Sequence, residues 1–212
     1  MPVTAKYEWK KNDKALYLPK EEPAIIEVPV FRYFRISGEG NPNYEPFREA
    51  VGVLYSLSYG VKMLPKKGMV PEGYYEYTIF PLEGVWDLAV EARGLEVLDK
   101  DKLLYTIMIR QPDFVTEPLA MDVLKTVKAK KPHVLLGKVM FGEQEEGLCL
   151  QMMHHGSYDD EPQSFAKMER YCDEHGLKRI SKLHKEIYIS DPRKTQADKL
   201  RTVLRFRVEK NE

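Results

Sequence analysis

The same order of secondary-structure elements is expected twice along this chain of 212 residues, and this limits the folds that it can form. Apolar residues alternate in some segments, as in β-strands, and recur at helical spacing in others. In the first half these patterns predict a strand at 25–36, a helix with apolar positions from Phe47 to Val61, and strands at 74–80 and 103–110. In the second half they predict a strand at 148–155, a helix from near Asp160 to Gly176, and strands at 184–190 and 200–208. A helix at 117–131, capped by Thr116, is predicted between the halves.

Local details of the two halves also match. In each half a strand with a central glutamate leads into a proline, with Glu76 in the first and Glu186 in the second. Phe47 and Phe165 occupy matching early positions of the two helices. Chance similarity is the alternative explanation, because strand and turn motifs resemble one another. We favour a true duplication.

We therefore predict an α+β fold in which two pseudo-symmetric strand–helix–strand–strand modules join their strands into one antiparallel sheet. The first module covers about 20–115, and the linker helix and second module cover about 116–212, within a single domain over 1–212. A central ligand cleft is expected between the modules, because concave junctions of this kind commonly bind ligands.

The charges of the chain argue against a nucleic-acid partner. Its 33 Lys and Arg residues balance 33 Asp and Glu residues, whereas proteins that coat nucleic acid carry a cationic excess. An acidic stretch at 143–174 precedes a basic carboxyl-terminal end that starts at Lys178. This end could form a basic groove, but no nucleic-acid-binding motif accompanies it. We favour cations that pair with their acidic neighbours.

The sequence indicates neither a membrane protein nor a protein held together by disulfides. No segment reaches the roughly 18 uninterrupted apolar residues of a membrane helix, and the first residues lack the apolar core of a signal peptide. The two cysteines, Cys149 and Cys172, have no Cys-x-x-Cys spacing, so neither a disulfide framework nor a thiolate zinc site is expected. We expect no membrane partner and a cytoplasmic location.

Glu186 is the carboxylate that could carry chemistry. It falls in the middle of a predicted strand, on one face with His184 and Tyr188, while Ile187 points the other way. The structural interpretation is that it pairs with a cation on the 200–208 strand. In a hydrophobic cleft, by contrast, burial would raise its pKa and make it a proton acceptor near neutral pH. It could also hold a cationic ligand.

Four further residues are candidates with weaker signals. Tyr158 follows a glycine that ends a strand, so it could donate a hydrogen bond into a cleft or simply cover the surface. His154 and His155 are adjacent in a strand and point to opposite faces, which argues against a shared metal. Trp86 falls in an expected connection, where it is either a lid over a ligand or part of the local core. The nucleotide-binding loops and the serine-hydrolase elbow are absent from the sequence.

Several runs of residues, taken together, resemble the GyrI-like small-molecule-binding proteins over most of the chain, from about Lys6 to Val208. The resemblance rests on the runs Ile36–Pro42, Tyr55–Lys62, Pro81–Trp86, His155–Glu161, His184–Thr195 and Lys199–Arg205. Such proteins bind planar, often cationic, drug-like molecules in a cleft lined by aromatic residues and one acidic residue. Glu186 falls on that acidic position.

The stand-alone branch that this chain resembles includes cyclopropanoid cyclopropyl hydrolases, which open the cyclopropane of DNA-alkylating natural products of the yatakemycin and duocarmycin type. The resemblance implies that Glu186 deprotonates a water and that Tyr158 donates a hydrogen bond to the ligand. It also implies ligand-binding roles for aromatic and imidazole side chains around them, namely Trp86, Phe80, Tyr55, His155 and Tyr188. No metal or organic cofactor is required. Where relatives often carry His-His-Glu, this chain has Lys185 before Glu186, and we expect Lys185 to point away from the site.

Two other functions stay open. The chain could be a non-catalytic multidrug-binding protein that sequesters cationic aromatic ligands, with Glu186 as their counter-ion. It could also resemble relatives that inhibit a topoisomerase, although no sequence feature favours this. A small aromatic ligand is the expected partner for both hydrolysis and sequestration. A homodimer is a possible assembly.

Overall fold

The computed structural model describes residues 6–89 and 99–211. Two short helices, α1 (Trp9–Asn12) and α2 (Lys14–Tyr17), come first. The longer helices are α3 (Glu45–Lys62), α4 (Glu117–Lys130) and α5 (Glu161–Glu174). The strands are β1 (Ala24–Val28), β2 (Phe31–Glu39), β3 (Leu82–Leu88), β4 (Leu103–Gln111), β5 (Met140–Gln144), β6 (Gly147–His155), β7 (Leu177–Arg179), β8 (His184–Tyr188) and β9 (Arg201–Lys210). Short 3-10 turns include Tyr158–Asp160, which is η5.

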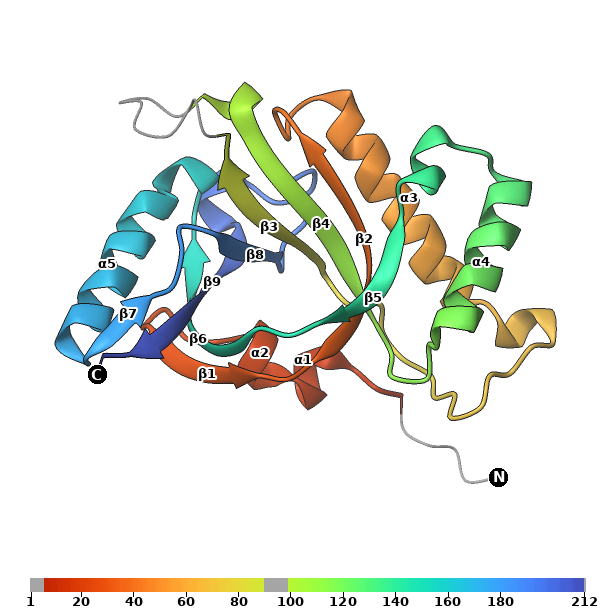
Figure 1. Cartoon of the computed structure of the whole chain (residues 1–212), viewed down its shortest axis with the longest axis horizontal. Coiled ribbons are helices and arrows are strands. Elements are labelled where there is room, and N and C mark those ends of the chain that lie inside the picture. The colour runs from red at the N-terminus through yellow and green to blue at the C-terminus, as the bar shows by residue number, and fades with distance from the viewer. Residues whose placement is uncertain (1–5, 90–98, 212) are drawn as a thin grey trace.

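The strands form one curled sheet with the order β1-β6-β9-β8-β3-β4-β2-β5, and β7 pairs with β9 beside this path (Figure 1). The pairs along this path are antiparallel. The order is symmetric about the β3–β8 pair, with β4 and β2 on one side and β9 and β6 on the other. The α+β class and the joined antiparallel sheet are therefore confirmed.

The outer strands cross from one half of the sheet to the other. β1, from the first half of the sequence, pairs with β6 from the second half. β5, from the second half, pairs with β2 from the first half. Each half of the sheet thus ends on a strand from the opposite half of the sequence. The division of the chain at about residue 115 into two modules stays a prediction.

The three longer helices lie at opposite ends of the curled sheet (Figure 1). α3 and α4 pack side by side at one end, and α5 covers the other end. The predicted apolar stripe of α3 is buried at Ala50, Leu54, Leu57 and Val61. The Thr116 side chain caps α4 by accepting a hydrogen bond from the Leu119 amide, as expected.

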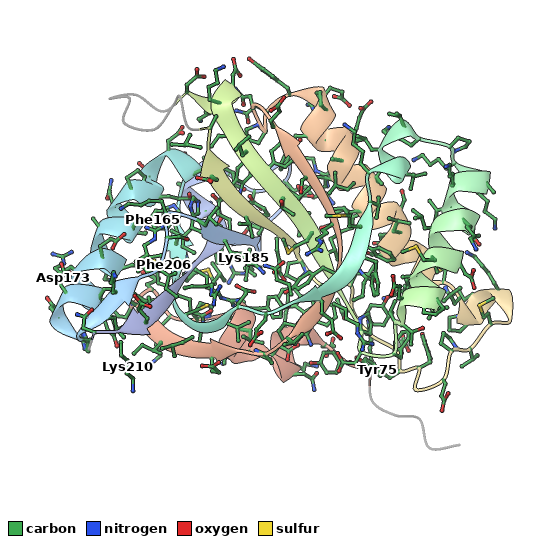
Figure 2. All side chains as sticks on the ribbon, in the orientation of Figure 1. Tyr75, Phe165, Asp173, Lys185, Phe206 and Lys210 are labelled. Carbon is green, nitrogen blue, oxygen red and sulfur yellow. The ribbon has the colours of Figure 1, made fainter. Side chains whose placement is uncertain are left out.

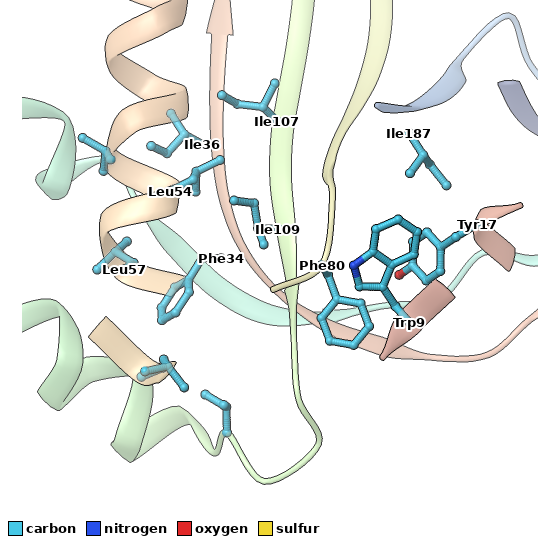
Figure 3. Close-up of a cluster of buried hydrophobic side chains, with 14 of the residues drawn as sticks. Trp9, Tyr17, Phe34, Ile36, Leu54, Leu57, Phe80, Ile107, Ile109 and Ile187 are labelled. Atoms are coloured by element: carbon cyan, nitrogen blue, oxygen red, sulfur yellow. The ribbon is translucent and has the colours of Figure 1, made fainter. Parts of the chain in front are cut away.

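The main core lies between the first half of the sheet and α3, and it continues toward α1 and α2 (Figure 3). Phe34, Ile36, Ile107 and Ile109 of β2 and β4 pack in this core with Leu54 and Leu57 of α3. Trp9, Tyr17, Phe80 and Ile187 form its other part. Burial of each such side chain contributes roughly 1.5–3 kcal/mol. A smaller core below α5 contains Leu150, Met168, Cys172, Leu204 and Phe206.

Two strand predictions are wrong. The segment 25–36 is two strands, because Pro29 has no amide hydrogen to donate and the chain changes partners there. The segment 74–80 is not a strand, since its one bridge joins Tyr77 to Tyr7. The paired strand is instead β3, which carries Trp86, so Trp86 lies in a strand and not in a connection. The sequence likeness between Glu76 and Glu186 is therefore not a structural equivalence.

None of the helices in the described parts of the chain is long and apolar enough to cross a membrane.

Candidate functional site

Glu186 lies at the centre of the sheet, where β8 pairs with β3. Its backbone partner is Gly84, and the next pair along the same face is His184 with Trp86. Its side chain contacts those of His184 and Tyr188, while Ile187 packs into the core from the other face. This arrangement is the one that the alternation of the strand predicts. Glu186 is 9% exposed, so its carboxylate is largely removed from solvent.

A chain of hydrogen bonds orients the carboxylate. The Trp86 indole Nε1 donates to the Tyr188 hydroxyl over 2.8 Å. The Tyr188 hydroxyl donates to Glu186 Oε2 over 2.9 Å. An indole N–H can only donate, so the Tyr188 hydroxyl must use its proton toward Glu186. Burial, with the nearby charge of Glu186, raises the pKa of Tyr188 well above its usual value and keeps that proton in place.

The other carboxylate oxygen faces an imidazole. His184 Nε2 lies 3.1 Å from Glu186 Oε1, and the His184 side chain is 22% exposed. Glu186 therefore has one oxygen fixed by Tyr188 and one beside a group that can accept, donate or carry a proton.

Two helices supply an aromatic cover for this part of the sheet. The Phe47 ring of α3 stacks on Trp86, with 5.8 Å between ring centroids. The Phe165 ring of α5 meets His184 edge-on at 4.8 Å, and Figure 2 shows Phe165 beside Phe206 near α5. The matching helix positions that the sequence assigns to Phe47 and Phe165 thus have matching contacts across the β3–β8 pair.

Glu161 is a second buried carboxyl group in the site, and the sequence reasoning missed it. It lies in the first turn of α5, is 7% exposed, and its Oε1 has no hydrogen-bond partner among the described residues. Burial, then the charges of Glu186 and Asp159, raises its pKa to about 10. The signal available was its place at the end of the family-like run that starts at His155.

Glu161, His184 and Glu186 each have one possible metal-ligand atom near those of the other two. These three atoms lie within 4.8 Å of one another. Two carboxylates and an imidazole form a donor set that divalent transition metals accept. Among the described residues, this is the group of side chains that could hold a metal ion.

The structure brings Tyr158, another of the predicted residues, to this site. The Tyr158 ring, in η5, meets the Tyr188 ring edge-on, with 6.0 Å between centroids. Burial, followed by the charges of Glu186 and Glu161, raises the Tyr158 pKa above its usual value. Tyr55, on α3, is half-buried, and burial, followed by the charge of Asp191, raises its pKa.

Phe80 and His155 are not brought to Glu186. Phe80 is 1% exposed and packs with Tyr17 and beneath the Arg110 guanidinium, and Figure 3 shows it beside Trp9 and Tyr17. Phe80 lies outside the strand that carries Trp86, because β3 begins at Leu82, after Pro81. His155 is exposed at the end of β6, with its Nε2 3.5 Å from Glu21. His154 points to the opposite, buried side, as predicted, and contacts Ser164 and Ser157.

The group around Glu186 is closely packed. Trp86 is 5% exposed and Tyr188 is half-buried. A groove of about 440 Å³ lies between α3 and α4 and is lined by other residues, among them Met63, Val123 and Val127. The central ligand cleft therefore stays a prediction.

Lys185 points away from Glu186, as expected, and belongs to a buried ion cluster on the other side of the sheet. Its Nζ lies 2.9 Å from Glu83 Oε2 and 2.6 Å from Glu146 Oε1. Arg205 reaches the same Glu146 oxygen at 3.6 Å. Figure 2 shows Lys185 in the middle of the molecule. These ion pairs connect β3, β8 and β9 directly beneath the candidate site.

Comparisons with known proteins agree with this fold. Residues 21–209 match the model of the GyrI-like small molecule binding domain. A hydrolase from Listeria innocua is 35% identical, with a TM-score of 0.87, and the match covers 96% of this chain and 100% of that one. An uncharacterized conserved protein from Listeria innocua is 36% identical, with a TM-score of 0.88 and the same coverage.

A more distant structure shares the fold alone. The C-terminal domain of EcmrR is 13% identical, with a TM-score of 0.51, over 92% of this chain and 99% of that one. The search of curated proteins found no match. Because the family model matches most of the chain, the protein belongs to the GyrI-like small-molecule-binding domain family.

Proposed function

We propose that the Glu186 site binds flat aromatic, drug-like xenobiotics and hydrolyses the cyclopropane ring of DNA-alkylating compounds of the yatakemycin and duocarmycin type. The observation that carries this proposal is the buried Glu186 carboxylate, which Tyr188 and Trp86 hold as a hydrogen-bond acceptor below aromatic rings. The name "hydrolase" of the Listeria innocua relative supports a hydrolytic reaction. Protection of the cell and a cytoplasmic location stay predictions.

In the proposed reaction, Glu186 takes a proton from a water molecule as the water oxygen bonds to the cyclopropane CH₂ carbon. The ring C–C bond breaks, and its electron pair moves through the conjugated dienone to the carbonyl oxygen. The dienone becomes a phenolate, and proton uptake gives the phenol. One water is added in total, and the Glu186 proton returns to solvent.

Tyr158 is the proposed hydrogen-bond donor to the oxygen that becomes the phenolate. Its raised pKa keeps the hydroxyl protonated at neutral pH, as a donor must be. The site must also make room for the ligand, because Phe47 now covers the Trp86 ring. We expect the half-buried Phe47 ring to move aside and a flat ligand to stack on Trp86 in its place.

The second candidate function is non-catalytic binding of cationic aromatic compounds. The buried carboxylate of Glu186 favours this alternative, since a ligand with a positive charge would offset its negative charge. In that case Glu186 is a counter-ion and no bond of the ligand changes.

Two assays carried out in parallel separate the two functions. The protein is incubated with a cyclopropanoid alkylator, and the ring-opened product is followed by mass spectrometry. Binding of a cationic aromatic dye is measured in parallel by fluorescence titration. Ring opening faster than in buffer supports hydrolysis. Tight dye binding that Glu186→Gln abolishes, with no acceleration of ring opening, supports the alternative. Glu143→Gln, on the exposed Arg32 pair, is the matched control for Glu186→Gln.

A further inference from the structure

We propose that Glu161, His184 and Glu186 form a binding site for one divalent transition metal ion, with Zn²⁺ as the preferred ion. This site does not depend on the proposed hydrolysis, and a bound ion would compete with it for Glu186. The three residues come from α5 and β8 and meet under the aromatic cover of Phe165.

The spacing of the donor atoms is close to that of a zinc site. Two ligands of a tetrahedral Zn²⁺ lie about 3.4 Å apart, given bond lengths near 2.1 Å. His184 Nε2 and Glu186 Oε1 are 3.1 Å apart. All three ligand atoms lie within 4.8 Å of one another, so the third must approach by roughly 1.4 Å at most to meet that spacing. Rotation of the Glu161 side chain can supply this movement.

An independent observation points to a missing partner at this place. Glu161 is 7% exposed, yet its Oε1 has no hydrogen-bond partner among the described residues. Buried polar atoms are almost always paired, so such an atom calls for an explanation, of which an ion is one. A metal ion between Glu161 and Glu186 would replace the proton of Glu161, bind this oxygen and offset the charge of both carboxylates.

The surrounding residues already orient the donors as supporting residues do in metal sites. Tyr188 binds Glu186 Oε2, which leaves Oε1 directed toward His184. Trp86 in turn fixes Tyr188. Such supporting hydrogen bonds select the oxygen that binds the metal and hold it in place. Three protein ligands would leave a fourth position for water or for a ligand.

The choice of Zn²⁺ follows from the donors. An imidazole nitrogen with two carboxylates suits Zn²⁺, whereas Ca²⁺ and Mg²⁺ prefer oxygen ligands and higher coordination numbers. Coordination of the ion would occupy Glu186 Oε1, while Tyr188 already donates a hydrogen bond to Oε2. Neither oxygen would then be available to take a proton from water. We therefore expect bound Zn²⁺ to slow any hydrolysis in which Glu186 is the base.

The test is isothermal titration calorimetry of the full chain, stripped of metal, with Zn²⁺. We expect one ion per chain, with at least ten-fold weaker binding in Glu161→Gln and in His184→Gln. The matched controls are Glu209→Gln, in an exposed pair with Lys178, and His175→Gln, at the end of α5. Both controls should bind as the wild type does. Circular dichroism of each metal-free variant establishes that it is folded.

Co²⁺ provides a second readout that a folding defect cannot imitate. Visible absorption of the Co²⁺-loaded wild type should show the bands of a four-coordinate site, and Glu161→Gln should lose them. No binding of Zn²⁺ by the wild type, or binding that is unchanged in both site variants, would overturn the proposal. Ring opening measured with a chelator present tests the proposed hydrolysis separately, because that reaction needs no metal.

Discussion

Gly84 lies directly opposite Glu186 in the antiparallel pairing of β3 with β8. A side chain at position 84 would occupy the space that the Trp86 indole and the Tyr188 hydroxyl now use, since a Cβ atom there would lie 2.8 Å from Trp86 Nε1 and 3.1 Å from Tyr188 Oη. The glycine thus permits the hydrogen-bond chain from Trp86 through Tyr188 to Glu186.

Gly84→Ala should therefore disturb the site. We expect a loss of about 1–3 kcal/mol in the free energy of unfolding, because the indole and the hydroxyl must both shift. Chemical denaturation measures this loss, and Trp86 fluorescence in a Trp9→Phe background reports the displaced indole. Gly142→Ala is the matched control, since the nearest atom to its Cβ is 3.9 Å away. Equal stability of the two alanine variants would contradict the packing described here.

Tyr188→Phe removes the hydroxyl at the middle of the chain. The Trp86 N–H and Glu186 Oε2 then lose their partner, and each buried group left unpaired costs about 1–3 kcal/mol. We expect lower stability in thermal unfolding. Tyr171→Phe, at a ring stacked on His175, should unfold like the wild type. A Tyr188→Phe protein as stable as this control would show that the hydrogen bonds contribute nothing.

Lys185→Met should be strongly destabilising, because it leaves the buried carboxylates of Glu83 and Glu146 without this cation. Breaking a buried ion pair on one side costs about 3–5 kcal/mol. Lys178→Met removes a cation from an exposed pair with Glu209 and should cost less than about 1 kcal/mol. Urea denaturation at pH 7 compares the two, and equal losses would contradict the role of the buried cluster.

The same cluster predicts how this loss depends on pH. Burial alone would raise the pKa of Glu146, but Lys185 and Arg205 lower it below its usual value. A lowered folded-state pKa stabilises the protein above the unfolded value of about 4.3, and this contribution is lost as the pH falls through the folded-state pKa. The difference in unfolding free energy between wild type and Lys185→Met should therefore shrink as the pH falls below about 4.3. A difference that grows on acidification would refute this assignment.

Neither thiol should react while the protein is folded. Burial, followed by the charge of Glu146, raises the pKa of Cys149 to about 11, so roughly one thiol in a thousand is ionised at pH 8. Cys172 is 2% exposed, and burial raises its pKa as well. A colorimetric thiol reagent should label both residues in denaturant and neither in buffer. Labelling of the folded Cys172→Ser variant at the rate of free cysteine would contradict the burial of Cys149.

Much of the second half of the fold could be predicted from local sequence. The strand ending at His155, the helix from Glu161 and the carboxyl-terminal strand carry regular apolar patterns, and the structure has all three. The orientation of Glu186 and Lys185 on opposite faces also follows from the alternation of a strand. Local patterns suffice there because β6 and β9 each bury five or more consecutive residues and α5 buries Met168 and Cys172.

The first half shows where local patterns fail. The aromatic residues at 74–80 suggest a strand, yet Tyr75 and Tyr77 pack on Phe114 as part of a loop. The true strand β3 contains Glu83 and Gly84, which suggest a turn. Its stability comes from β8, about a hundred residues away, through the ion pair of Glu83 with Lys185.

The candidate site was predictable only in part for the same reason. Trp86, Tyr188 and Glu186 are joined by hydrogen bonds, and their roles toward a ligand stay predictions. Glu161 looked like one of many acids in an acidic stretch, and its burial depends on how α5 packs near β8. Phe80 has the right residue type, but the turn into β3 places it in the core.

The rate of cyclopropane ring opening by the wild type and by Glu186→Gln tests the central claim most directly. Turnover at saturating ligand is followed by mass spectrometry, and the dissociation constant of each protein is measured separately with the same ligand. General base catalysis contributes about 10²–10⁴-fold, so we predict that Glu186→Gln lowers kcat by that factor and still binds the neutral ligand. A Glu186→Gln protein that opens the ring as fast as the wild type would contradict the account.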